Sequence, residues 1–206
     1  YPRVAAVASE KGVVVWQHGG TGNDNRLRWQ CFDGQSWTST AQVTPSTGFE
    51  GYPWLEVDGQ GRFHVVHDHG LGDARTIHYN RYDGADCFGS WKQTAEVVPK
   101  DPAYAGYSTP YPSLDIDEND HPYVTYSQAI VPKGDLRECV DDTECEAGYH
   151  CWNNERCVAN YLQYFTWRNG GDWAGGDWLL PLAINPATSE HLSHHGAVFV
   201  LDSSSV

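Results

Sequence analysis

A repeated dipeptide that opens each of three units is the feature that most constrains the fold of this chain. It occurs at Tyr1-Pro2, Tyr52-Pro53 and Tyr111-Pro112. A short apolar strand, a polar turn and a second strand follow each time, with the turns at residues 9–12, 58–61 and 117–120. The second strands are predicted at residues 13–18, 62–69 and 122–128, which are rich in strand-forming residues. Self-similarity at a spacing of this size indicates a repeat architecture.

Each unit continues with two more strands. Third strands are predicted at residues 27–34, 77–84 and 162–170, and each is followed by a tryptophan: Trp37, Trp91 and Trp173. Fourth strands are predicted at residues 41–44, 95–98 and 179–184. Four short antiparallel strands per unit are typical of a propeller blade, so the sequence predicts one all-β, propeller-like domain over residues 1–206. Its units are residues 1–51, 52–110 and 111–192, and we expect an incomplete propeller, an open one, or closure by a tail strand at 196–201 that pairs with the first unit.

Six cysteines indicate disulfide bonds and an oxidising compartment. Four stand at six-residue steps within a polar stretch, which predicts a cysteine-rich module inserted at residues 130–160 of the third unit. A zinc knuckle favours ligand pairs two to four residues apart, a closer spacing than this one. Cys31 and Cys87 lie at similar places in the first two units, which predicts a disulfide between them. The favoured pairs are Cys31 with Cys87, Cys139 with Cys151, and Cys145 with Cys157.

Charge and hydropathy limit the partners of this protein. The 13 Lys and Arg residues against 27 Asp and Glu give a formal charge of −14, which repels nucleic acid and anionic lipid. No apolar stretch is long enough to span a membrane, and no signal peptide stands at the start. The chain begins with Tyr1 and contains no Met, so it reads as a processed chain or a fragment. We expect a monomer that is secreted or associated with the outer cell surface.

Histidines in the second strands suggest a metal site. Trp16 and His18 stand two residues apart, on one face of a strand, and the matching strand of the second unit carries His64, His67 and His69. Aligning the units places His67 and His69 at the positions of Trp16 and His18, so His64 has the opposite parity and is the predicted partner of His18. If the sheets are irregular, His67 or His69 takes that place. Imidazoles without thiolate suit copper or zinc, although a buried pair of hydrogen-bonded histidines beside a packing tryptophan stays open as an alternative.

The other histidines are expected to have structural or solvent roles, and a cluster near the end only adventitious metal affinity. The first group is His78, His121 and His150, and the second is His191, His194 and His195.

The strand Trp16-Gln17-His18, a second histidine one unit later and the acidic, exported character resemble the copper-binding surface proteins of methane-oxidising bacteria, the family of MopE and CorA. The resemblance implies copper, largely Cu(I), held by two histidines and a tryptophan oxidised to kynurenine. It assigns these roles to His18, His64 and Trp16. Opening the pyrrole ring of the indole creates an aniline amine that can donate to a soft metal. The resemblance also implies copper acquisition at the cell surface.

A calcium ion has been associated with that family, and an acidic turn offers candidate ligands here. These are Asp115, Asp117, Glu118 and Asp120. A solvated acidic turn explains the same residues.

A carbohydrate-binding β-propeller is the alternative function. Nine Trp and 12 Tyr could form stacking platforms, and residues 33–37 partly match the Asp-box turn of sialidases, with Cys31 where that pattern has Ser. No Arg triad of a sialidase is apparent. A copper oxidase would use a Cys thiolate beside histidine, and all six cysteines are predicted to be paired. We therefore expect no enzymatic activity.

Overall fold

The computed structural model describes most of the chain. The described residues are 1–7, 11–19, 25–45, 48–70, 75–84, 87–98, 111–129, 137–152, 155–159, 161–168 and 177–184. The predicted tail strand at 196–201, Trp173 and the histidine cluster near the end lie outside them.

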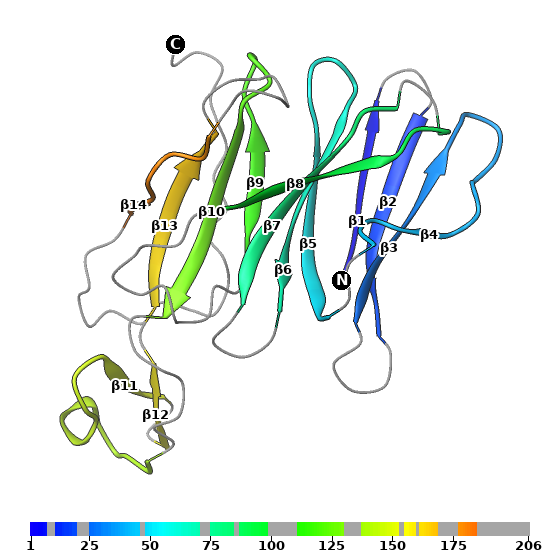
Figure 1. Ribbon diagram of the computed structural model, residues 1–206. Helices are drawn as coiled ribbons and strands as arrows, with labels where there is room; N and C mark the ends of the chain where they lie inside the picture. The colour runs from blue at the N-terminus through cyan, green and yellow to red at the C-terminus, as the bar shows by residue number, and fades with distance from the viewer. Residues whose placement is uncertain are drawn as a thin grey trace.

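Three four-stranded antiparallel sheets form the body of the protein (Figure 1). Blade 1 contains β1 (Pro2–Val7), β2 (Lys11–His18), β3 (Arg26–Phe32) and β4 (Ala41–Gln42). Blade 2 contains β5 (Glu50–Val57), β6 (Phe63–His69), β7 (Thr76–Tyr82) and β8 (Trp91–Val98). Blade 3 contains β9 (Ser113–Ile116), β10 (Pro122–Ala129), β13 (Tyr161–Trp167) and β14 (Leu182–Ala183).

Strand order within each sheet follows the chain, which confirms the predicted all-β, propeller-like architecture. The first strands lie next to one another, since β5 contacts both β1 and β9, and the later strands of each blade extend outward. β5 begins at Glu50, slightly before the predicted unit boundary at 51/52. The fourth strands of blades 1 and 3 are shorter than predicted, with two residues each.

Two hydrophobic cores join the blades. The core between blades 1 and 2 gathers side chains from β2, β3, β5, β6 and β7, among them Val13, Val15, Trp29 and Phe63. The core between blades 2 and 3 includes Tyr79 and residues of β9, β10 and β13. Alternation along β3 is regular, with every second residue buried, as expected for a strand with one face on a core. These cores fix which face of each strand points to which neighbour.

All three predicted disulfides are confirmed. Cys31 bonds to Cys87 and ties blade 1 to blade 2, and both residues are buried in the core between these blades. Cys139 bonds to Cys151, and Cys145 to Cys157. Disulfides of this number fit a protein of an oxidising environment.

The cysteine-rich module is a separate small unit inserted between β10 and β13 (Figure 1). It holds the hairpin of β11 (Tyr149–Trp152) and β12 (Arg156–Ala159) and the short 3-10 helix η3 (Asp142–Glu144). Its cysteines form their own buried cluster, apart from the two cores of the blades. No helix among the described residues is long and apolar enough to cross a membrane.

Candidate functional site

Trp16 and His18 lie on the face of β2 that points away from blade 2. Strand residues alternate between the two faces of a sheet, and Val13 and Val15 are packed in the core between blades 1 and 2. Trp16 and His18 have the opposite parity, and their side chains are partly buried and exposed, respectively. Neither residue faces the histidines of the second blade.

His64 is enclosed on the face of blade 2 that packs against blade 3. Its side chain is 1% exposed, and its ring lies beside Tyr79, a member of the core with blade 3. Nε2 lies 2.8 Å from Asp58 Oδ2 and Nδ1 lies 2.5 Å from the Tyr79 hydroxyl. Burial lowers the pKa of His64, so the ring is neutral, Nε2–H donates to the carboxylate and Nδ1 accepts from the hydroxyl. Both nitrogens are thereby occupied.

The predicted group of Trp16, His18 and His64 is not brought together by the structure. His18 ends β2 opposite Arg26, whose guanidinium donates to the carbonyl of Gly48 just before β5. His64 pairs instead with Glu56 near the far end of β5. The parity argument had Trp16 and His18 facing blade 2 and His64 facing blade 1, whereas in the structure Trp16 and His18 face away from blade 2 and His64 faces blade 3.

Three other imidazoles gather between blades 1 and 2, and we call them the blade-2 histidine cluster: His67, His69 and His78. His67 and His78 are cross-strand partners with ring centroids 5.6 Å apart. The rings of His69 and His78 are stacked at 4.1 Å, and those of His67 and His69 are 6.5 Å apart. His67 and His69 have the parity of Phe63 and therefore face blade 1.

The position of the cluster keeps its imidazoles neutral. Burial lowers the pKa of His67 and of His69, while the carboxylate of Glu50 opposes part of that shift. Burial, with the nearby charges of His67 and His69, lowers the pKa of His78 to about 3. Glu50 is fully buried, and its side chain accepts hydrogen bonds from the Leu27 amide and the Thr44 hydroxyl. Neutral rings are the form of histidine that binds metals.

Unsatisfied polar atoms concentrate in this cluster. Nδ1 of His69 and Nδ1 of His78 are buried without a hydrogen-bond partner among the described residues. Oδ1 of Asn80 is in the same state, although its Nδ2 lies 3.1 Å from His67 Nε2. Nδ1 of His67 donates to the Asp68 carbonyl at 3.0 Å, which leaves Nε2 as the acceptor. Buried polar groups usually have partners, so this concentration suggests a ligand.

His78 is the member of the cluster that the sequence analysis assigned to a structural role. The hairpin register could have predicted its place, because His78 stands opposite His67 once β6 and β7 pair. His67 and His69 were named there as alternatives to His64.

The acidic turn of blade 3 does not gather its oxygens around one point. Asp117 accepts from the amides of Asn119 and His121 and from the Tyr123 hydroxyl. Asp120 reaches across to blade 2, where it accepts from the Gly59 amide at 2.9 Å. Among the described residues no group of carboxylates forms a convergent site of the kind calcium needs.

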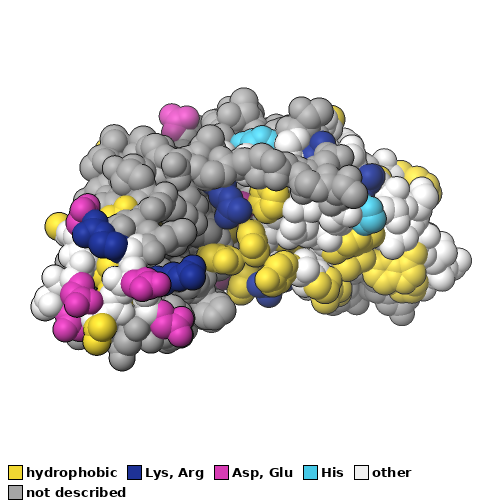
Figure 2. Space-filling model, turned by 90° about the horizontal axis from the view of Figure 1, so that it is seen from below, with side chains coloured by type: hydrophobic (Ala, Val, Ile, Leu, Met, Phe, Trp, Pro, Cys, Tyr) yellow, Lys and Arg dark blue, Asp and Glu magenta, His cyan; other side chains and the backbone are white. Residues whose placement is uncertain are grey.

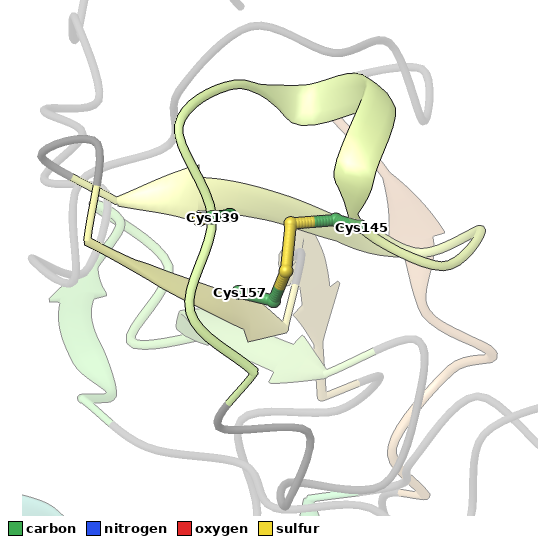
Figure 3. A group of neighbouring side chains, drawn as sticks. All are labelled: Cys139, Cys145 and Cys157. Atoms are coloured by element: carbon green, nitrogen blue, oxygen red, sulfur yellow. A yellow bond between two sulfur atoms is a disulfide. The ribbon is translucent and has the colours of Figure 1, made fainter.

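Three cysteines of the module bring potential metal ligands together, as Figure 3 shows for Cys139, Cys145 and Cys157. Their sulfurs are committed to disulfides, Cys145 with Cys157 and Cys139 with Cys151. A sulfur in a disulfide is no thiolate, so this group is a structural staple.

Comparison with known proteins leaves the family open. No family model matches the sequence, and no curated protein is similar to it. Among solved structures, a polysaccharide lyase described as an ulvan lyase is 14% identical over 81% of this chain, with a TM-score of 0.45. The chain spans only 37% of that lyase's length. The arabinanase Arb43A of Bacillus subtilis is also 14% identical, over 84% of this chain and 72% of its own, with a TM-score of 0.44.

Proposed function

We propose that this protein is an exported copper-binding protein and that the blade-2 histidine cluster holds the metal, with Cu(I) as the favoured state. The observation that carries the proposal is the pair of buried Nδ1 atoms of His69 and His78, which lack partners among the described residues. The two rings are stacked with centroids 4.1 Å apart and an interplanar angle of 14°, so their in-plane lone pairs run nearly parallel. The histidine nitrogens do not converge on one point in this structure, and a change of side-chain rotamer would bring them to one ion. His67 would be the third ligand, through Nε2, when the Asn80 amide moves aside.

The donor set selects the metal. Among the described residues, imidazoles and the Asn80 amide form the cluster, and the nearby carboxylate of Glu50 is engaged by blade 1. Imidazole nitrogens bind copper and zinc well and calcium or magnesium poorly. The hydrogen bond from His67 Nδ1 to a backbone carbonyl is the arrangement that commonly orients a metal-binding histidine.

The disulfide bonds agree with copper capture outside the cytosol. Three disulfides indicate an oxidising environment, which favours a secreted or cell-surface location. A role in copper acquisition would follow from that location. The site does not include Trp16 or His18, which face away from blade 2.

Copper retention tests the proposal. Tag-free protein is loaded anaerobically with Cu(I), desalted against a chromogenic Cu(I) chelator and analysed for metal. We expect one copper per chain, and at least tenfold weaker binding in His69→Ala and in His78→Ala. His18→Ala, which removes an exposed imidazole of β2, is the matched control and should bind as the parent does.

Two results would overturn the proposal. The first is a parent protein that takes up no stoichiometric copper or prefers Zn(II). The second is a His18→Ala variant that loses copper while His78→Ala keeps it.

A further inference from the structure

The tyrosines that open the three units meet at the inner edges of the blades. Tyr1 and Tyr52 have ring centroids 5.1 Å apart, and Tyr52 and Tyr111 4.7 Å apart in a T-shaped arrangement. The Tyr1 side chain is 73% exposed, while those of Tyr52 and Tyr111 are partly buried. We call this group the tyrosine trio. None of its members belongs to the proposed copper site.

Two members of the trio have a strained backbone conformation. The φ angles of Tyr52 and Tyr111 are 50° and 61°, in the left-handed region that bulky residues rarely adopt. Both residues precede a proline, which further restricts their backbone. Such strain persists only where the surrounding structure enforces it, and it clusters at functional sites. Its recurrence at equivalent positions of two blades gives the trio a common geometry.

Hydroxyls and cations border the rings. Burial, together with neighbouring Tyr52, raises the pKa of Tyr111 to about 12, so its hydroxyl remains a hydrogen-bond donor at neutral pH. Arg75 lies near Tyr111 electrostatically and stacks over the Phe49 ring at 5.0 Å. Arg3 donates to the carbonyl of Pro53, the residue after Tyr52, at 3.2 Å. These two guanidinium groups lie near the trio, where Arg75 also pairs with Asp68 at 3.5 Å and Arg3 lies 3.9 Å from the centroid of the Trp54 ring.

The trio lies at the end of the blades where first strands begin and second strands end. Figure 1 shows that the chain start and the cysteine-rich module are at this lower end. Figure 2 views it from below: hydrophobic side chains, the class that includes Tyr, gather near the middle of the face, with Lys or Arg beside them. The charged module stands to one side.

We propose that the tyrosine trio, with Arg75 and Arg3, binds an acidic sugar unit of a polysaccharide. Aromatic rings stack on the apolar faces of sugars, and tyrosine hydroxyls bond their hydroxyl groups. Guanidinium is the side chain best matched to a carboxylate or sulfate on such a sugar.

Titration calorimetry with a short oligogalacturonide, in buffer containing EDTA, tests the site independently of copper. We expect saturable binding that weakens as salt increases, because the ion pairs are near the surface. Tyr1→Ala and Arg75→Gln should each weaken it at least fivefold, and Tyr52→Phe should weaken it while keeping the ring. Trp37→Ala is the matched control, since this exposed tryptophan belongs to blade 1 outside the trio.

Three outcomes would overturn the inference: no saturable binding, equal affinity for a neutral dextran oligosaccharide, or equal loss in Trp37→Ala and Tyr1→Ala. Thermal unfolding of each variant separates a lost fold from a lost site. Because this titration uses protein that has not been loaded with copper, failure here leaves the copper proposal untouched, and failure of copper binding leaves this one untouched.

Discussion

Removing the disulfide between Cys31 and Cys87 should destabilise the blades far more than removing either bridge of the cysteine-rich module. The two residues are separated by 56 positions. Cross-linking a loop of that length reduces the entropy of the unfolded chain, which raises the free energy of the unfolded state by about 4 kcal/mol at room temperature. Both sulfurs are buried in the core between blades 1 and 2, so their loss also leaves a small cavity. The double variant Cys31→Ala/Cys87→Ala should therefore lose about 4–5 kcal/mol of unfolding free energy.

Urea denaturation followed by tryptophan fluorescence measures this loss. Of the nine tryptophans, Trp29 is buried in this core and Trp91 packs against it, so the summed emission includes the junction of blades 1 and 2. With a urea dependence near the upper end of the usual range, the midpoint should fall by roughly 1.5–2 M.

Cys145→Ala/Cys157→Ala is the matched control. These residues are separated by 12 positions and belong to a cluster apart from the blade cores. The chain-entropy model assigns this bridge about 3 kcal/mol, which would be felt within the module alone. An equal midpoint shift in both double variants, or a shift of under about 0.5 M in the first, would refute the reasoning.

Three further predictions concern stability. Burial lowers the pKa of the cluster histidines, His78 to about 3, so unfolded imidazoles take up protons first as pH falls. The free energy of unfolding should thus drop below about pH 6.5, by at most about 1.4 kcal/mol per pH unit for each group; a flat urea midpoint would contradict this. Asp120→Asn should cost about 1 kcal/mol by weakening bonds to blade 2, whereas exposed Glu118→Gln should cost nothing measurable in the same assay. Gly89→Ala should lower the melting temperature by the equivalent of about 1–3 kcal/mol, because its Cβ would lie 2.4 Å from Gly84 Cα; an unchanged melting temperature would contradict that contact.

Much of the fold could be predicted because the same pattern of strands and turns recurs in three units. Three units with the same succession of strands and turns predict three sheets, and the strand order in each sheet follows from short turns. The pairing of Cys31 with Cys87 followed from their similar places in successive units. The lengths of the fourth strands were less predictable, since outer strands have few partners that fix where they end.

The direction in which each strand faces could not be read from the sequence. On β2 both faces are apolar, with Val13 and Val15 on one and Val14 and Trp16 on the other. Period-two alternation states which residues share a face, and it leaves open which face meets the next blade. The prediction of His64 as a partner of His18 failed at this step, and His78 was missed because its contact depends on strand register.

Equivalent positions in the repeat share a direction, yet they do not share an environment. Trp16 and His67 are equivalent, and both point toward the preceding side of their blade. For His67 that side is blade 1, which encloses the ring completely; no described blade precedes blade 1, and Trp16 remains partly exposed. Enclosure lowers the pKa of an imidazole and withholds water from its nitrogens. The same position therefore yields a candidate metal ligand only where a blade packs against it, which is why the proposed copper site is at blade 2 and not at β2.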